Sequence, residues 1–462
     1  MLLKNKLENI QKFLNSDNVL TKIEERYCYS KDASNLKRQV KIPDVVVFVK
    51  TIEEVQKVLK YANEHEIPII ARGAGTNMVG ACVSDNGGIV LNFSKMNKIL
   101  EINKTNLTAK VQPGVVLGEL KKEAEKIGLF YPPDPSNYKV STIGGSIAQS
   151  SAGAMAFKYG TTKDYILSLK VVTASGELLQ LGAETSKDAV GYHLNQLIIG
   201  SEGTLAIVVE ATLKLIPKPE AKQIVIGYFN SEENLTCAVN EIISQGVFPA
   251  SIDFMDKNSM ITVEDFAHCG LKIENKYVLL IDLDGFKSSM KEQIERTHQA
   301  LLSSNATEIV IPKDSFEAET YWNARRSSYA ASTRLAPDVL SEDVIVPREK
   351  VALLIKKCEE ISEEFGLKIC LVGHLGDGNL HPQFVLDLNN EDEYRNYQTA
   401  KTTLYKAVVE LGGSISAEHG VGIEKKSFLE NTINKDSINY MKLIKKIFDP
   451  KNILNPGKIF DL

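Results

Sequence analysis

Two hydrophobic patterns alternate along the chain between Pro43 and Pro217. Short apolar runs that end at glycine, proline or polar residues predict buried strands. Apolar residues spaced three or four apart predict helices between some of these strands. The predicted strands cover residues 45–49, 67–71, 88–93, 107–112 and 169–174, and the predicted helices cover residues 52–65 and 117–127.

The same alternation resumes after a proline- and lysine-containing stretch at residues 217–222, which is interpreted as a linker. Because strands alternate with helices, the chain is expected to be α/β or α+β. Residues 2–28 are expected to be helical, and residues 423–462 to form a helix with an extended tail. Further strands are expected near residues 223–229, 277–283 and 368–372, and further helices near 234–245, 287–303 and 348–365. The predicted segments are therefore residues 1–42, 43–217, 218–422 and 423–462.

The composition argues against several classes of protein. The 462 residues carry a net charge of −5, so a basic face for nucleic acid is not expected. The longest apolar runs are too short to span a bilayer, and the amphipathic N-terminus lacks the apolar core of a signal peptide. We expect a cytoplasmic protein, with peripheral membrane attachment left open. The six cysteines form no C-x-x-C pair, which argues against an iron–sulfur cluster or a structural zinc site.

A glycine-rich loop follows the strand predicted at residues 67–71. In the segment RGAGTN (72–77), small residues allow consecutive backbone N–H groups to form an anion-binding concavity. A dinucleotide fingerprint for NAD would need a helix directly after this loop. The sequence ACVSDNGGIVLNF reads instead as a turn and a strand, so the NAD fingerprint fails.

Two more glycine-rich loops follow, at residues 141–161 and 200–215, and the rigid turn PPDPSN (132–137) precedes the first of them. A single loop of this kind is more often structural. Three within 150 residues, beside short strands, favour a long cofactor with a diphosphate.

The ordered series RGAGTN, PPDPSN, TIGGSIAQSSAG, KYGTT and GSEGTL resembles the FAD-binding domain of the vanillyl-alcohol-oxidase superfamily. The tail NPGKIF and the histidine motifs described next make the chain similar to the glycolate oxidase and D-lactate dehydrogenase branch. The resemblance implies an α+β fold. It consists of a PCMH-type FAD-binding domain with two α/β subdomains, a cap domain with an antiparallel sheet, and a C-terminal segment that returns to the FAD domain.

The resemblance also implies which residues bind FAD. Members with covalent flavin often carry histidine in the first loop, whereas this chain has Asn77, so non-covalent FAD is expected. The implied FAD-binding residues are Arg72, Gly73, Ala74, Gly75, Thr76, Asn77, Met78, Pro133, Asp134, Ser136, Thr142, Gly144, Gly145, Ser146, Gly153, Tyr159, Glu202, Gly203, Ile207, Asn455 and Lys458.

Two histidines in the motif GHLGDGNLH (373–381) are candidate metal ligands. Asp377-Gly378 is a two-residue turn signal between apolar runs and predicts a hairpin. A turn centred there pairs Gly376 with Asn379, Leu375 with Leu380, and His374 with His381. Directly opposite residues share a face of a sheet, so the two imidazoles could chelate one divalent ion.

A second motif, SAEHGVG (416–422), supplies a candidate third ligand in Glu418. In an extended segment Glu418 and His419 would point to different sides, so each could have its own task. The resemblance implies His374, His381 and Glu418 as ligands of zinc, manganese or iron(II), and His419 as the base. The alternative is a polar cluster that only orders a turn.

The resemblance implies FAD-dependent oxidation of D-lactate or a close D-2-hydroxy acid to the 2-oxo acid, by hydride transfer to flavin N5. This reaction also needs a partner for the substrate carboxylate. Arg325 occupies the place of the family's W-x-x-R segment and is the first choice, although Arg326 and Arg334 lie nearby. Asn379 could bind substrate or only complete the turn. Some relatives that handle longer diacids carry a small hydroxyl residue at the position of Tyr329 and a lysine at the position of Ser341. D-lactate or glycolate therefore fits better than 2-hydroxyglutarate.

No internal electron relay is visible, so an electron-transferring flavoprotein, a quinone or oxygen is expected to accept the electrons. A homodimer is a further candidate assembly. Three other functions stay open: a glycolate oxidase FAD subunit, a flavin-binding electron-relay subunit without substrate turnover, and a nicotinamide-linked dehydrogenase. The intact histidine–glutamate set favours catalysis over the relay subunit, and the failed fingerprint argues against the nicotinamide enzyme.

Overall fold

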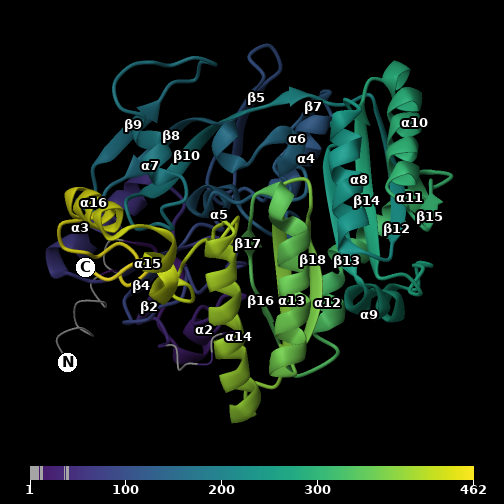
Figure 1. Cartoon of the computed structure of the whole chain (residues 1–462). Coiled ribbons are helices and arrows are strands. Elements are labelled where there is room, and N and C mark those ends of the chain that lie inside the picture. Colours follow the sequence, from purple (N-terminus) through teal and green to yellow (C-terminus); the bar gives the residue numbers. More distant parts are fainter. Residues whose placement is uncertain (1–9, 11–13, 36, 38–40) are drawn as a thin grey trace. The chain divides into compact units, whose positions relative to one another are not determined.

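The structure is a computed structural model that describes residues 10, 14–35, 37 and 41–462 (Figure 1). The chain divides into two compact units. Unit 1 comprises Met1–Ser151, Thr161–Lys218 and Glu418–Leu462, and unit 2 comprises Ala152–Gly160 and Pro219–Ala417. The C-terminal segment thus belongs with the first part of the chain, and a short piece of the second glycine-rich loop belongs with unit 2.

The first sheet of unit 1 has the order β1-β2-β4-β3, in which β2, β4 and β3 run parallel and β1 is antiparallel. Helix α3 (Ile52–His65) is capped by Thr51, whose side chain accepts a hydrogen bond from Glu54 N, and it buries Val55 and Leu59 against the sheet. The strands are β1 (Val19–Leu20), β2 (Val45–Phe48), β3 (Ile69–Arg72) and β4 (Ile89–Asn92).

The second sheet of unit 1 is antiparallel, with the order β5-β6-β10-β8-β9, and a separate pair joins β7 to β11. Their strands are β5 (Ile99–Asn103), β6 (Thr108–Val111), β7 (Leu129–Phe130), β8 (Ile166–Val172), β9 (Leu178–Gly182), β10 (Ile207–Lys214) and β11 (Ile216–Pro217). The remaining helices of unit 1 are α2 (Ile23–Tyr27), α4 (Leu117–Glu125), α5 (Ile143–Gln149), α7 (Leu194–Ile198), α15 (Leu429–Thr432) and α16 (Lys435–Phe448).

The N-terminal segment differs from the expected helix. Residues 1–9 and 11–13 lie outside the described residues. In the described part, a 3-10 turn at Ser16–Asn18 leads into β1, which pairs with β2, and only Ile23–Tyr27 is α-helical. The expectation of one helix up to residue 28 is therefore wrong for this part, because Val19 and Leu20 complete the edge of a sheet.

Unit 2 is built on an eight-stranded antiparallel sheet with the order β15-β12-β14-β13-β18-β19-β16, and β17 also pairs with β19. The α+β class predicted from the sequence is confirmed. The strands are β12 (Ala221–Phe229), β13 (Ser251–Asp256), β14 (Tyr277–Gly285), β15 (Glu308–Val310), β16 (Asp338–Ser341), β17 (Val344–Ile345), β18 (Lys368–His374) and β19 (Asn379–Leu386).

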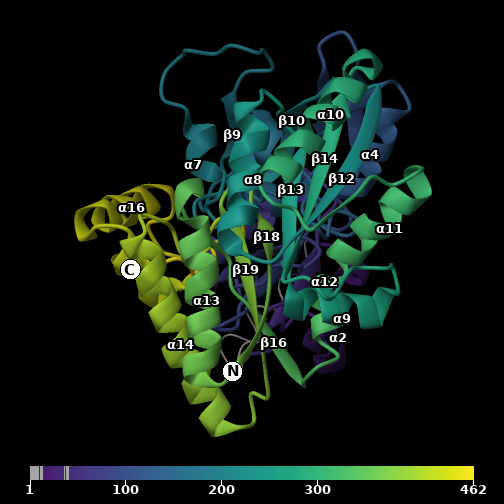
Figure 2. The ribbon, with the colours of Figure 1, turned by 45° about the vertical axis from the view of Figure 1, so that its right-hand side comes forward.

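Helices cover both faces of this sheet, with α13 and α14 on one side and α9, α11 and α12 on the other (Figure 2). The second face carries a hydrophobic core that includes Met255, Val372 and Trp322. Asp253 and His374 lie on the same face, each two residues from Met255 or Val372 on its strand. The helices of unit 2 are α6 (Ala156–Tyr159), α8 (Glu232–Ser244), α9 (Lys257–Ala267), α10 (Lys287–Ser303), α11 (Ser315–Arg326), α12 (Ser328–Ser332), α13 (Val351–Phe365) and α14 (Glu391–Glu410).

A buried lysine attaches the C-terminal segment within unit 1. Lys445 of α16 donates to the backbone oxygens of Thr204 at 2.8 Å and Leu454 at 2.9 Å, and it pairs with Asp449. Only 3% of its surface is exposed. This contact holds the chain beside β3, where Leu454 bridges to Ile69.

Replacing Lys445 with methionine should destabilise unit 1, because it removes these hydrogen bonds and leaves the buried Asp449 carboxylate without its cation. The expected loss is about 3 kcal/mol, seen as a lower midpoint of urea unfolding. Lys446→Met, at the exposed neighbouring position, is the matched control and should change stability by less than about 0.5 kcal/mol. Equal effects of the two substitutions would contradict this account.

Candidate functional site

The glycine-rich loops of unit 1 line one continuous set of pockets. A first pocket is walled by the loop after β3, by α5 and the residues before it, and by Glu418 and His419. A second pocket adjoins it and shares Gly73, Thr142 and Gly145. The predicted FAD-binding residues on these walls are Arg72, Gly73, Ala74, Gly75, Thr76, Asn77, Met78, Ser136, Thr142, Gly144, Gly145, Ser146, Glu202, Gly203 and Ile207.

Glycine is required where two of these loops meet. A Cβ atom on Gly73 would lie 2.2 Å from Thr142 Oγ1. Thr142 cannot easily turn away, because the same oxygen accepts from Gly145 N at the start of α5. Asn77 fixes the other end of the first loop by accepting from the backbone N–H groups of Val79 and Ala81, both at 2.9 Å.

The walls of the first pocket also carry polar atoms that fit a cofactor rich in hydrogen-bonding groups. Ser141 Oγ and Gln149 Oε1 are buried, and neither has a hydrogen-bond partner among the described residues. Buried polar atoms of this kind are usually satisfied by a ligand or an ordered water. Together with the glycine-rich loops, they make the pocket suitable for FAD.

The remaining predicted FAD residues are not among those that line the two pockets. Asp134 pairs with Lys121 at 3.2 Å, and the amide of Asn455 donates to the backbone oxygens of Ala81 and Glu202 at 2.7 Å. Tyr159 belongs to unit 2, where its hydroxyl donates to Asp284 at 2.6 Å. Pro133, Gly153 and Lys458 also lie outside the two sets of pocket-lining residues.

His419 stands on the wall of the first pocket because two contacts hold its loop. Glu202 accepts hydrogen bonds from Val421 N at 2.7 Å and Gly422 N at 2.9 Å. Asn77 donates to the backbone oxygen of His419 at 3.3 Å. Burial raises the pKa of Glu202 to about 7, against the lowering effect of these backbone N–H groups and of Lys458.

The predicted hairpin is confirmed, but its predicted pairing is wrong. His374 pairs with Asn379 and Val372 pairs with His381, so residues 375–378 form a four-residue turn. Asp377 N and Gly378 N both donate to His374 O at 3.1 Å, and Leu375 is buried in the turn. The actual pairing is shifted by two residues, which keeps both histidines on one face. Their ring centroids are 5.3 Å apart.

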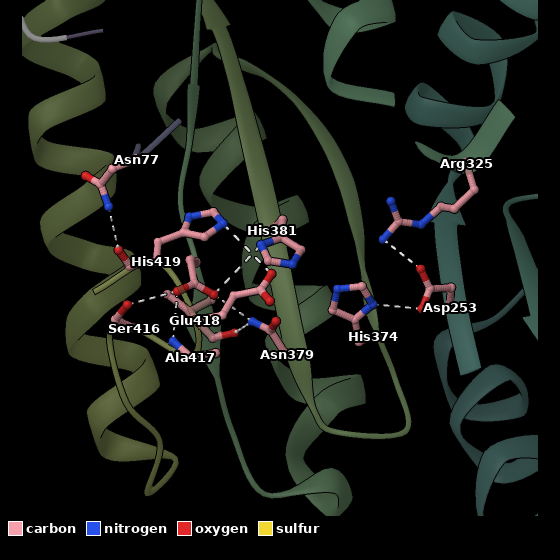
Figure 3. A network of polar contacts seen from close by, with 12 residues as sticks. Asn77, Asp253, Arg325, His374, Asn379, His381, Ser416, Ala417, Glu418 and His419 are labelled. Atoms are coloured by element: carbon pink, nitrogen blue, oxygen red, sulfur yellow. Dashed lines mark hydrogen bonds and ion pairs between the residues drawn. The ribbon is translucent and has the colours of Figure 1, made fainter. Parts of the chain in front are cut away.

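Two aspartates that the sequence did not predict, Asp253 and Asp343, lie near the histidine rings, and Figure 3 shows Asp253 beside His374. Asp253 Oδ1 lies 2.7 Å from His374 Nδ1, and Asp253 Oδ2 lies 3.0 Å from Arg325 Nη2. Asp343 Oδ1 lies 3.8 Å from His381 Nδ1 and accepts from Asn379 Nδ2 at 2.9 Å. Acidic residues inside otherwise apolar segments, SIDFM and SEDVIV, are the only sequence signal for them.

Asp343 also anchors the chain just before Glu418. Its Oδ2 accepts from Ser416 Oγ at 2.9 Å and from Ala417 N at 2.8 Å. The expectation of an extended segment here is wrong, because the chain bends at residues 417–419. Glu418 Oε1 and His419 Nε2 lie 3.9 Å apart.

Comparisons with known proteins identify the class. The profile of the C-terminal domain of FAD linked oxidases matches residues 218–459, and the profile of an FAD binding domain matches residues 43–182. A solved structure of p-cresol methylhydroxylase with substrate bound has a TM-score of 0.83 at 16% identity, covering 99% of this chain and 97% of that chain. This likeness shows a shared PCMH-type fold. The two matched domain profiles, together with the relatives given below, show that the protein is an FAD-dependent oxidoreductase.

The chain belongs to the FAD-linked D-lactate dehydrogenase and glycolate oxidase family. It is 41% identical to glycolate oxidase subunit GlcD of Bacillus subtilis (strain 168), over 94% of this chain and 92% of that protein. It is 35% identical to a D-lactate dehydrogenase of Anaerostipes hadrus, over 90% of this chain and 89% of that protein. In the described part of the chain, no helix is long and apolar enough to cross a membrane.

Replacing Gly73 with alanine should weaken FAD binding, because the new methyl group would force the first loop away from Thr142. Overpacking of this kind costs about 1–3 kcal/mol, which corresponds to roughly tenfold or more in affinity. The measurement is the flavin absorbance retained per protein after dialysis. Gly118→Ala in α4 is the control, because its Cβ would meet ordinary contacts of 3.4 Å or more. Equal flavin retention in both variants would refute the prediction.

Glu202 should make stability depend on pH. Because its folded pKa of about 7 lies above the ordinary value of 4.5, the fold favours the protonated carboxyl. Its contribution is therefore complete below about pH 4.5 and is lost as the pH rises through 7. Glu202→Gln stays neutral, so the stability advantage of the parent over this variant should fall by about 1–3 kcal/mol between pH 5 and 8. Urea unfolding at each pH measures this, and a constant difference would contradict it.

Proposed function

We propose that this protein oxidises a small D-2-hydroxy acid, D-lactate in particular, to the 2-oxo acid with FAD and one divalent metal ion. His374, His381 and Glu418 are the proposed ligands of zinc, manganese or iron(II). The observation that carries the proposal is the pair of imidazoles on one face of the β18–β19 hairpin, 5.3 Å apart. His374 Nδ1 is hydrogen-bonded to a carboxylate at 2.7 Å, an arrangement typical of metal-binding histidines, and a second carboxylate lies 3.8 Å from His381 Nδ1.

Glu418 is proposed as the third ligand from its place in the chain. It follows Ala417, whose backbone N–H is bound to Asp343, and Asp343 also holds Asn379 two residues before His381. A catalytic zinc site commonly has three protein ligands and keeps one position open for substrate. When bound, the metal would lower the pKa of the substrate hydroxyl, and FAD would accept the hydride.

His419 is the proposed base. It lies on the wall of the pocket that fits FAD, and the contacts of Glu202 and Asn77 fix its loop. Histidine is the side chain that most often serves as a general base, so it suits the removal of the hydroxyl proton.

Arg325 is the proposed partner of the substrate carboxylate. Its guanidinium uses Nη2 to bind Asp253, whereas its buried Nε has no hydrogen-bond partner among the described residues. The two other candidate arginines pair with exposed carboxylates, Arg326 with Glu319 and Arg334 with Asp265. Asn379 is left with a supporting role in this proposal, because its Nδ2 atom donates to Asp343 and to the backbone oxygen of Val344.

A monocarboxylate substrate is proposed over a diacid. The hydroxyl of Tyr329 donates to the backbone oxygen of Val339 at 3.3 Å, and Ser341 pairs with Gln383 in the sheet. Neither residue supplies a cation for a second carboxylate. Electrons are proposed to leave to an electron-transferring flavoprotein or a quinone. The second candidate is the FAD subunit of a glycolate oxidase, which the 41% identity to subunit GlcD favours.

Anaerobic reduction of the bound flavin tests the proposal. D-lactate should bleach the flavin absorbance faster than L-lactate, glycolate or D-2-hydroxyglutarate. Treatment with a chelator should abolish bleaching, and a divalent metal should restore it. Faster bleaching by glycolate would favour the second candidate. A bound flavin that none of these acids reduces would contradict the dehydrogenase function.

A further inference from the structure

One carboxylate in unit 2 serves two groups that the proposed function uses separately. Asp253 Oδ1 contacts His374 Nδ1 at 2.7 Å, and Asp253 Oδ2 contacts Arg325 Nη2 at 3.0 Å (Figure 3). The side chains of Asp253 and Arg325 are 2% and 9% exposed, so water competes little for either contact. The carboxylate therefore joins the imidazole and the guanidinium directly.

The position of the Asp253 carboxylate is fixed by a strand pairing, by the hydrophobic core and by helix α11. Strand β13 pairs with β18 so that Asp253 lies directly opposite His374. The next residues along the same face, Met255 and Val372, belong to the hydrophobic core. That core also contains Trp322 and Ala324 of α11, the helix that carries Arg325. A movement of Asp253 would therefore require movement of the packed core.

The contacts give Asp253 a definite chemical effect on each partner. A carboxylate beside Nδ1 favours the imidazole tautomer that carries its proton on Nδ1, and this leaves the lone pair of Nε2 for a metal. The charge on the carboxylate also holds one Nη group of Arg325 and leaves Nε with its proton available to a ligand.

We propose that Asp253 is a positioning residue that couples the metal ligand His374 to the carboxylate-binding Arg325, so that its loss weakens metal binding and substrate binding together. This inference rests on the proposed function. Asp253 itself contacts neither the metal nor the substrate in this account. It acts through the tautomer of His374 and through the position of the Arg325 guanidinium.

Asp253→Asn tests the inference, because asparagine keeps the shape but has one acceptor oxygen and no charge. Metal-free protein with FAD bound is titrated with Zn²⁺ in the presence of a competing chelator. Zinc affinity should fall about 10–100-fold. With zinc saturating, KM for D-lactate should rise more than kcat falls, because the guanidinium has lost its anchor.

Asp282→Asn is the matched control. Asp282 is equally buried, lies on the neighbouring strand β14, and pairs with Lys222 at 2.8 Å. Its zinc affinity should stay within about threefold of the parent, as expected for a residue that is not behind a ligand. If Asp253→Asn does not retain FAD, Asp253→Glu replaces it, because the added methylene displaces the carboxylate from the imidazole and should also weaken zinc binding.

The outcomes separate the two proposals. Zinc binding by the parent, together with unchanged zinc affinity in folded Asp253→Asn, would overturn the role of Asp253 alone. A parent protein that binds no divalent metal would overturn the metal site of the proposed function, and this inference with it. Equal losses in Asp253→Asn and Asp282→Asn would show a general effect of the sheet and would also overturn the inference.

Discussion

The pairing of β18 with β19 is the constraint on which the candidate metal site depends. It brings His374 opposite Asn379 and Val372 opposite His381, so both imidazoles lie on the same face as Val372, which packs with Met260 of α9 and Trp322 of α11. The pairing of β13 with β18 then adds Asp253 to the same face. A shift of one residue in either pairing would turn these side chains to the opposite face. The burial of Met255 and Val372, two residues from Asp253 and His374 on the same strands, therefore fixes the face on which the site residues lie.

A second constraint acts on the short segment at residues 416–422, which carries Glu418 and His419. In unit 2, Asp343 binds its first part through Ser416 and Ala417. In unit 1, Glu202 binds its last part through Val421 and Gly422. Position 422 requires glycine, because the chain there passes close to Val79 and a Cβ would lie 2.1 Å from the backbone oxygen of Val79. One buried carboxylate thus fixes each end of the segment.

The sequence predicted local structure well and long-range partners poorly. Helical spacing located Ile52–His65 and Lys287–Ser303 with their observed bounds, and the glycine-rich loops identified most of the pocket walls. The pairing of His374 was wrong, because Leu375 is buried in the turn instead of extending the strand. Asp253 and Asp343 were missed because their partners lie far away in sequence, and only strand pairing brings them to the histidines. The role of Glu202 in holding residues 421–422 was missed for the same reason.

X-ray absorption of the zinc-loaded protein measures directly whether the β18–β19 hairpin supplies two imidazole ligands to one metal ion. We expect a nitrogen and oxygen shell at roughly 2.0–2.1 Å with the outer-shell scattering of two imidazole rings. His381→Gln should remove the scattering of one ring. A shell without imidazole scattering, or one with sulfur at about 2.3 Å, would show that the two histidines do not bind the metal.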